Sequence, residues 1–324
     1  MRHVFIVNPI AGKGREQPVL MRRIESYFAK NGGSYAVLVP KNKEDTAAVA
    51  REEALKGGNL RLYAVGGDGT LSDVVNGVYG CQNVEVGAIP CGSGNDFVAA
   101  FGDRLAFLDV EGQTKGTSVP LDLIKTPFGL ALNQCSVGFD SAVVHNQKKL
   151  KKLPFIGGSL SYSLAIFYSF IRNIRFPLAV SIDDAESTSA DYLLCIAANA
   201  PFYGGGIKSA PSASPCDGLL EFICVDAVSR MTIFKLLKKY RAGEHYSLPF
   251  VHPSKGEKIE ISSACQFPVN IDGEAYLSKN VVFEVVKQGV KFILPAVCAE
   301  RLGEEARANT GILRALPAFC KEGE

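Results

Sequence analysis

The sequence lacks the features of a disulfide-linked or zinc-clustered protein. Its nine cysteines are odd in number and scattered, and no two of them form a C-x-x-C pair. This usage excludes a disulfide framework and a zinc knuckle, and it indicates a reducing compartment. The four histidines show no metal-ligand spacing. We therefore expect Cys195, Cys216 and Cys224, which lie in or beside apolar strand patterns, to act as small hydrophobic side chains.

An excess of charge and a long apolar run are also missing. The formal net charge is +2, from 35 basic and 33 acidic residues, so no nucleic-acid partner is expected. The apolar run at residues 2–7 is too short for a signal sequence. Residues 159–176 are rich in Tyr, Phe, Ile and Leu, but Arg172 and Arg175 interrupt them, and a membrane span needs about 20 largely apolar residues. The sequence therefore predicts a cytoplasmic protein.

What the sequence does have is a regular alternation of strand and helix patterns in its first 125 residues. Strands are predicted near 2–7, 35–39, 60–65 and 84–89, and helices near 17–30, 44–57, 70–79 and 95–101. Such alternation is typical of a doubly wound, mostly parallel sheet with helices on its faces. The first domain is therefore predicted to be an α/β nucleotide-binding domain.

The pattern changes at about residue 126 to short β-type runs separated by Gly, Pro and Asn. These runs fall at 129–137, 177–183, 191–198, 218–225, 257–263, 267–272 and 280–286, with helical patterns only at 159–173 and 230–241. This texture predicts a mostly antiparallel β-sandwich domain. The expected domains are residues 1–125 together with about 292–324, and residues 126–291, with a cleft between them. The segment from 297 to 324 is predicted to be a helix followed by a loose end.

Three glycine-bearing loops follow strands of the predicted parallel sheet. They are residues 8–14 after the first strand, 66–70 after the third and 90–96 after the fourth. The carboxyl ends of parallel strands meet at one edge of a sheet, where ligands bind, and glycine turns at helix N-termini suit phosphates. None of the loops has the Walker pattern, and none reads G-x-G-x-x-G with an acid about 20 residues later. The sequence thus predicts a nucleotide held by neither of the commonest schemes.

The motifs in these loops carry a family resemblance. The runs N-P-x-A-G-K at 8–13, G-G-D-G-T-L at 66–71 and P-x-G-S-G-N-D-F at 90–97 resemble the diacylglycerol-kinase catalytic-domain family, which includes soluble bacterial lipid kinases. The likeness continues through Asn133, Val137–Asp140, Asn199, Tyr203–Gly206, Pro211, Asp217–Leu219 and Asp272–Glu274. It covers residues 2 to about 295 in the family's order. It implies an α/β domain, a β-sandwich domain and a C-terminal return to the first domain.

The resemblance implies that the protein binds ATP as phosphoryl donor, together with Mg²⁺. The residues expected at the nucleotide are Asn8, Pro9, Ala11, Gly12, Gly66, Gly67, Asp68, Gly69, Thr70, Leu71, Ser72, Gly92, Ser93 and Asn95. Asp68, Asp96 and Asp122 are expected to hold the catalytic magnesium, partly through waters. The alternative for Asp96 is a helix N-cap, because a helical pattern follows it.

Two further roles follow from the resemblance. A structural magnesium is expected from the resemblance at Ser214, Asp217 and Leu219, although residues 215–218 also read as a simple turn, which the sequence alone favours. Glu274 is the preferred general base for the lipid hydroxyl, with Asp68 as the alternative and an ordinary turn glutamate as the non-catalytic interpretation.

The predicted substrate is a membrane lipid, so transient contact with a membrane surface is expected. Two basic clusters could provide it: Lys148, Lys149, Lys151 and Lys152, and Lys235, Lys238, Lys239 and Arg241. A solvated helix face explains either cluster equally well. A homodimer is compatible with the sequence.

The predicted function is ATP-dependent phosphorylation of a lipid hydroxyl, with diacylglycerol giving phosphatidic acid. Phosphatidylglycerol, a sphingoid base or another lipid alcohol are alternative acceptors. An NAD kinase shares G-G-D-G-T but lacks the segment seen at 90–97. A nucleotide-binding membrane regulator without catalysis is the alternative from another functional class, and it is disfavoured because all the expected carboxylates are present.

Overall fold

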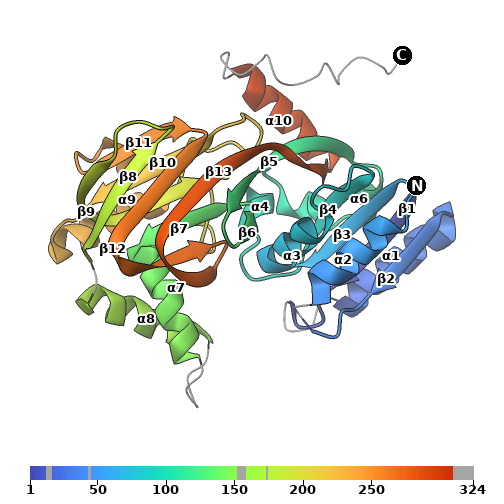
Figure 1. The fold of residues 1–324 in the computed structure, drawn as a ribbon. Helices are drawn as coiled ribbons and strands as arrows, with labels where there is room; N and C mark the ends of the chain where they lie inside the picture. Colours follow the sequence, from blue (N-terminus) through green and yellow to red (C-terminus); the bar gives the residue numbers. More distant parts are fainter. Residues whose placement is uncertain (12–16, 43–44, 152–157, 173, 309–324) are drawn as a thin grey trace.

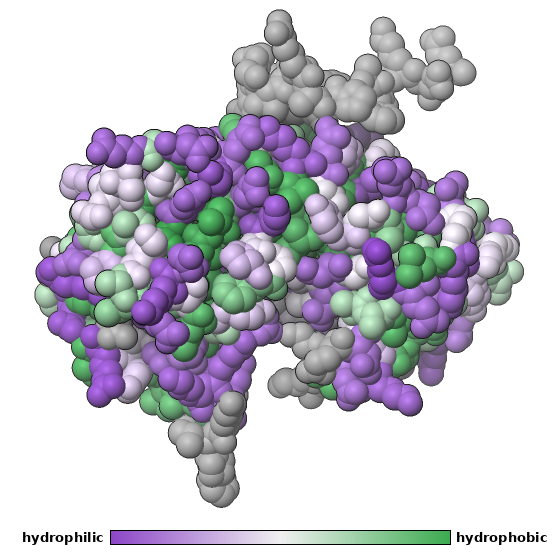
Figure 2. All heavy atoms as spheres, viewed as in Figure 1, coloured by the Kyte–Doolittle hydropathy of each residue, from purple (hydrophilic) through white to green (hydrophobic). Residues whose placement is uncertain are grey.

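The computed structural model describes residues 1–11, 17–42, 45–151, 158–172 and 174–308. They form two lobes that share one sheet of thirteen strands (Figure 1). The two lobes are separated by a notch at the lower edge of the space-filling view, and hydrophilic side chains cover most of that face (Figure 2). None of the helices in the described ranges is long and apolar enough to cross a membrane.

The first lobe contains four parallel strands in the order β4-β3-β1-β2. Its elements are β1 (Arg2–Val7), α1 (Gln17–Asn31), β2 (Ser34–Leu38), α2 (Asp45–Leu55), β3 (Leu60–Gly66), α3 (Asp68–Val78) and β4 (Val84–Pro90). Alternate side chains of β1 point to opposite faces: Val4 and Ile6 pack with α2 and α3, whereas Phe5 and Val7 pack with α1. Helices therefore cover both faces, and the predicted parallel α/β arrangement is confirmed.

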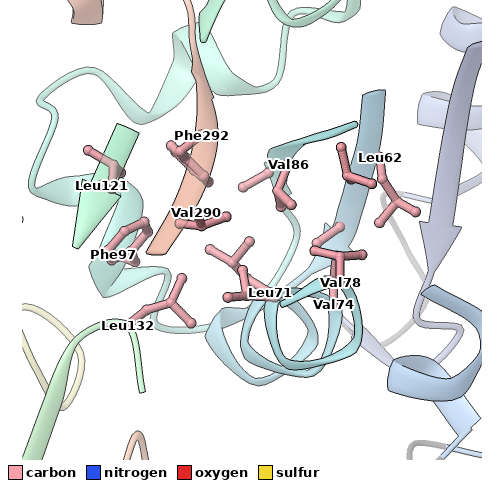
Figure 3. Packing of buried hydrophobic residues seen from close by; sticks show 14 of the residues in the cluster. Leu62, Leu71, Val74, Val78, Val86, Phe97, Leu121, Leu132, Val290 and Phe292 are labelled. Carbon is pink, nitrogen blue, oxygen red and sulfur yellow. The ribbon is translucent and has the colours of Figure 1, made fainter. Parts of the chain in front are cut away.

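A short helical segment and a long strand connect this lobe to the second one. The elements are α4 (Asp96–Ala99), α5 (Arg104–Phe107), α6 (Val110–Thr114), β5 (Thr117–Thr126), β6 (Gly129–Ala131) and β13 (Glu274–Leu294). Beyond its first half, β13 pairs with β5, and its Phe292 lies beside Val86 of β4. Figure 3 shows Val290 and Phe292 in one core with α3 and the parallel strands. Strand β13 runs through both lobes, so the sheet itself has no break that would mark a domain boundary. The predicted domain boundaries near residues 125 and 292 therefore stay predictions.

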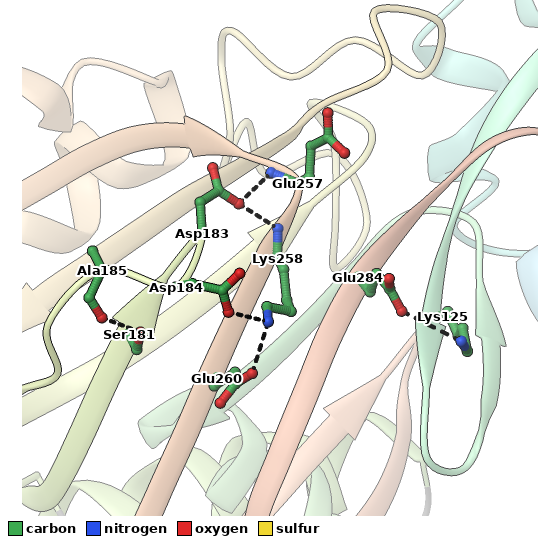
Figure 4. Close-up of polar contacts among 9 residues, drawn as sticks. All are labelled: Lys125, Ser181, Asp183, Asp184, Ala185, Glu257, Lys258, Glu260 and Glu284. Carbon is green, nitrogen blue, oxygen red and sulfur yellow. Dashed lines mark hydrogen bonds and ion pairs between the residues drawn. The ribbon is translucent and has the colours of Figure 1, made fainter.

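The second lobe is antiparallel, as the sequence predicts. Its strands are β7 (Gln134–Gly138), β8 (Phe176–Ile182), β9 (Thr188–Ala198), β10 (Leu220–Asp226), β11 (Val251–Gly256) and β12 (Lys258–Ile271). Strands β7 and β8 lie end to end between β9 and β12, and one apolar core joins all four. At the outer edge, Asp183 in the turn after β8 accepts the amides of Glu257 and Lys258 (Figure 4).

Helices α7 (Phe139–Leu150), α8 (Gly158–Arg172) and α9 (Arg230–Ala242) cover this lobe, together with a 3-10 turn η2 (His245–Ser247). The C-terminal α10 (Ala296–Ala308) instead packs on the core of the first lobe, where Cys298 is buried (Figure 1). The predicted helices at 159–173 and 230–241 are confirmed by α8 and α9. The expectation of only two helical stretches was wrong, because it missed α7. The apolar signal of α7 is weak, because its buried residues are only the small or medium-sized Ser141, Ala142 and Val143.

Candidate active site

The three glycine loops meet at the carboxyl edge of the parallel strands. The side chain of Asn8 donates to Thr70 Oγ1 at 3.0 Å, which joins the first loop to the second. The second and third loops are joined by the amide of Cys91, which donates to the carbonyl of Gly66 at 2.8 Å. The predicted gathering of these loops is therefore confirmed, except that Gly12 lies outside the described residues.

Glycine allows the second and third loops to approach this closely. A Cβ built on Gly92 would lie 2.4 Å from the Cα of Gly67, a distance that real atoms do not adopt. Ser93 is exposed at this edge, whereas Thr70 is buried. The side chain of Leu71 is buried in the core shown in Figure 3, so only its backbone could meet a ligand.

Asp68 and Asp96 are held by backbone amides at the junction of the two lobes. Asp68 accepts from the amides of Asn95 at 2.7 Å and Phe97 at 3.1 Å. Asp96 accepts from the amides of Gly205 at 2.8 Å and Gly206 at 2.7 Å, both in the second lobe. Burial raises the pKa of Asp96, and the nearby charge of Asp68 raises it further. Two carboxylates that repel each other in this way suit a divalent cation between them.

The helix-cap interpretation of Asp96 was wrong. The N-cap of α4 is Asn95, which adopts a left-handed conformation with φ of 61°, and Asp96 is the first helical residue. Both oxygens of Asp96 instead bind the glycine turn of the other lobe. The carboxylate therefore connects the nucleotide edge to the β lobe.

Asp122 is not brought to these two carboxylates. Its oxygens accept from the amides of Gly218 at 2.7 Å and Gln288 at 2.8 Å, and burial raises its pKa. Within the described parts of the chain, no three His, Cys, Asp or Glu side chains are grouped to hold a metal ion. The magnesium role of Asp122 stays a prediction that its present contacts do not support.

The expected structural metal site contains a lysine. Asp217 is 4% exposed and pairs with Lys255 Nζ at 2.7 Å, while its other oxygen accepts from the amide of Leu219 at 3.1 Å. Ser214 Oγ lies 3.4 Å from Cys216 Sγ. The ammonium group already supplies positive charge to the only carboxylate of the expected set. These residues, as placed, do not fit a magnesium ion.

An apolar cavity of about 420 Å³ begins beside Asp68 and Asp96. Its walls come mainly from the second lobe: Phe139, Val143 and Val144 of α7, Tyr162 and Ile166 of α8, Leu193 and Leu194 of β9, and Ile233 and Leu237 of α9. Polar lining groups are few, and they include Asn133, Asp140 and Asp272. The cavity therefore combines an end that carries carboxylates with a wall of apolar side chains.

Sequence reasoning gave no role to three of these polar residues. Asp272 accepts three backbone amides, from Leu132, Asn133 and Gln134, and Asp140 accepts from Ser136 Oγ at 2.5 Å. Burial raises the pKa of each carboxyl to about 6.

The third of these residues is Asn133. It is 5% exposed, and its side-chain oxygen has no hydrogen-bond partner among the described residues. Asn133, Asp140 and Asp272 lie in motifs of the resemblance, but no local pattern shows that they face a cavity.

Glu274 lies at the rim of this cavity and not on its wall. It is the first residue of β13, follows the cavity-lining Gly273, and pairs with Lys148 of α7, with each side chain 44% exposed. Lys148 is therefore engaged within the lobe, and Lys152 lies outside the described residues. Of the two base candidates, Asp68 lines the cavity and Glu274 stands at its rim, next to the lining residue Gly273.

Comparisons with known proteins agree with this geometry. Residues 2–126 match the family model of the diacylglycerol kinase catalytic domain. Residues 133–294 match the model of the YegS C-terminal NAD kinase beta sandwich-like domain.

Curated relatives align over most of the chain. A diacylglycerol kinase of Staphylococcus haemolyticus is 26% identical over 322 residues, covering 97% of this chain and 94% of the relative. YtlR of Bacillus subtilis, provisionally named a lipid kinase, is 27% identical over 301 residues, covering 83% and 92%.

A solved structure shares the fold. A Bacillus anthracis protein, provisionally assigned as a diacylglycerol kinase, superposes with a TM-score of 0.72 at 22% identity, covering 91% of this chain and 98% of the other. Together, the matching models account for both lobes, with an N-terminal catalytic domain and a C-terminal sandwich-like domain. The chain belongs to the diacylglycerol kinase family and is a lipid kinase, a phosphotransferase.

Proposed function

We propose that the protein transfers the γ-phosphoryl group of ATP to the hydroxyl of diacylglycerol, forming phosphatidic acid. The observation that carries this proposal is the cavity, which presents carboxylates at one end and apolar side chains along its walls. A lipid alcohol has the matching distribution, with one hydroxyl beside long hydrocarbon chains. The apolar wall disfavours a dinucleotide acceptor, and two relatives named diacylglycerol kinase support the choice of lipid.

The nucleotide is proposed to bind along the edge where the three loops meet. Glycine backbone there lets a phosphate approach closely, and the N-terminus of α3 contributes the positive end of its dipole. Asp68 and Asp96 would hold Mg²⁺, partly through waters. When bound, the ion would neutralise charge on the phosphate oxygens.

The acceptor hydroxyl would lie at the carboxylate end of the cavity. Its oxygen forms a bond to the γ-phosphorus while the bond from that phosphorus to the leaving ADP oxygen breaks, and its proton passes to a carboxylate. Asp68 and Glu274 are the two candidates to receive this proton. Asn133 offers a side-chain oxygen that has no partner in the described parts of the chain and that would orient the hydroxyl.

The test incubates the protein with labelled ATP, magnesium and a mixed lipid extract, and identifies the labelled product. Labelled phosphatidic acid is the expected result. A label on phosphatidylglycerol or a sphingoid base would move the acceptor to that lipid, and no labelled lipid would refute the proposed function.

Substitutions then assign the base. Asp68→Asn should lower turnover by at least about 100-fold, the usual range for losing a general base or a metal ligand. Glu274→Gln should cause a similar loss only if Glu274 takes the proton. Glu257→Gln is the matched control, because Glu257 also pairs with a surface lysine, Lys287, and neither residue lines the cavity. Near-full turnover of Glu274→Gln would assign the proton to Asp68.

A further inference from the structure

Helix α8 has its apolar and polar sides reversed with respect to a helix that faces water. Within residues 161–172 of α8, whose side chains are described, the fully buried positions are Ser161, Ala165 and Ser169, spaced four residues apart. Asn146 of α7 donates to Ser169 Oγ at 2.8 Å. Its large apolar side chains point outward: Phe167 is 63% exposed and Ile171 is 53% exposed. A helix solvated by water normally buries its large apolar residues. The outer side of α8 is therefore suited to an apolar medium.

Helix α9 extends the same apolar surface. Met231 is 71% exposed, and Phe234 is 62% exposed while its ring lies 5.0 Å from that of Phe170 of α8. Arg230 at the start of α9 donates to the carbonyls of Phe170 and Ile171, which fixes the two helices together. We name this surface the α8–α9 face and define it by Phe167, Ile171, Met231, Phe234 and Leu237. A patch of this kind marks an interaction site.

The cavity opens on the α8–α9 face. Tyr162 and Ile166 of α8 and Leu237 of α9 line the cavity, yet they are 40%, 37% and 50% exposed. Side chains that are at once cavity wall and outer surface form a mouth. The other end of the cavity carries Asp68 and Asp96. A hydrocarbon chain entering between the helices would therefore point its hydroxyl end toward the carboxylates.

The two helices that form this face carry charge of one sign. Helices α8 and α9 contain no acidic residue, and α9 carries Arg230, Lys238, Lys239 and Arg241 among its basic residues. Helix α7, which packs on α8, adds Lys149 in its last turn, whereas the neighbouring Lys148 is paired with Glu274. Basic groups around an apolar patch match the surface of a bilayer with anionic lipids. They match a second copy of this face poorly, because like charges would then meet.

We propose that the α8–α9 face docks on an anionic bilayer and that the lipid enters the cavity between α8 and α9. The inference rests on the proposed lipid-kinase function for the identity of the entering molecule. Of the two basic clusters in the sequence, the proposal therefore includes the one on α9 in the charged contact with the membrane, and not only the one that contains Lys148.

Vesicle binding without ATP tests the docking step separately from catalysis. The probe is vesicles of phosphatidylglycerol and phosphatidylcholine, and the test variant is Phe167→Gln with Met231→Gln, neither of which lines the cavity. We expect its binding to fall at least tenfold. The matched control, Leu55→Gln with Leu105→Gln, changes side chains that are 68% and 71% exposed in the first lobe, and should bind as the wild type does.

Two further measurements keep the result unambiguous. Turnover of the test variant on a dispersed short-chain diacylglycerol should stay within about twofold of the wild type. Lys238→Glu with Lys239→Glu should weaken binding to anionic vesicles but not to pure phosphatidylcholine.

Several outcomes would overturn docking. One is that the glutamine variant binds vesicles as tightly as the wild type, and another is that the control variant loses as much vesicle binding as the glutamine variant. A third is that the lysine variant binds anionic vesicles as tightly as the wild type. The last is that the wild type is a dimer and only the glutamine variant dissociates it. Docking without turnover on any lipid would instead refute the proposed function and leave docking standing.

Discussion

Gly69 provides the sharpest test of the nucleotide site, because the fold gives no reason for a glycine there. It is the second residue of α3, and a Cβ built on it meets no other atom within 4 Å. Gly77 on the same helix is different, since its Cβ would lie 2.3 Å from the carbonyl oxygen of Ala47. Space beside a helical glycine that no protein atom fills is space that a phosphate would use.

The expected effects on stability and on binding therefore have opposite signs. Alanine is favoured over glycine in a helix by up to about 1 kcal/mol, so Gly69→Ala should raise the free energy of unfolding by about 0.5 kcal/mol in this first turn. That gain corresponds to a rise in Tm of about 0.7 °C for a chain of this size. The same methyl group should weaken ATP binding by at least about tenfold, or about 1.4 kcal/mol.

The assay combines thermal unfolding without ligand with calorimetric titration of ATP and magnesium. Gly77→Ala serves as the matched control: it should lower Tm by several degrees, because α3 must move away from α2, and nucleotide affinity should change little in the protein that stays folded. If Gly69→Ala bound ATP as tightly as the wild type, the methyl would not meet the nucleotide, and the proposed phosphate position would be wrong. A fall in Tm would show instead that the glycine is structural.

Two other predictions concern charge. Burial raises the pKa of Asp140 from 3.8 to about 6, so ionisation of this carboxyl destabilises the folded state as pH rises from about 4 to 6. The free energy of unfolding of Asp140→Asn should therefore rise relative to that of the wild type by up to about 3 kcal/mol between pH 4 and pH 7. Parallel curves of Tm against pH for the two proteins would contradict this. Because Lys255 already pairs with Asp217, EDTA should leave Tm unchanged, whereas Lys255→Met should lower stability by about 2 kcal/mol. A marked EDTA effect with a neutral Lys255→Met would restore the metal assignment.

Most of the first lobe could be predicted because its signals are local. Three of the four parallel strands are short apolar runs followed by a glycine loop and a helix, and buried strands of this kind need no distant partner to be recognised. The meeting of the three loops follows from strand order alone. Helix α7 escaped prediction because its burial depends on α8 and the β lobe, and it has few large apolar residues of its own.

The cavity could not be predicted, because its walls come from segments that are far apart in the chain. Asp140 and Asp272 are separated by the whole second lobe, and their common environment depends on how α7 and β12 pack. The interpretation of Asp96 as a cap failed for the same reason, since its partners Gly205 and Gly206 are more than a hundred residues away. The sequence shows that a carboxylate is present, but its role depends on which backbone amides from distant parts of the chain bind it.

The contacts at the lobe junction bear on how such an enzyme would move. Asp68 is held by amides of the α4 segment, and Asp96 of that segment is held by amides of the second lobe, so a chain of hydrogen bonds runs across the junction. Strand β13 adds a continuous sheet between the lobes. Opening a hinge here would strip the buried carboxylate of Asp96 of its two donors in the second lobe, at a cost of about 1–3 kcal/mol for each lost bond. We therefore expect the nucleotide edge and the cavity to move as one body, and lipid entry to depend on side chains at the α8–α9 mouth.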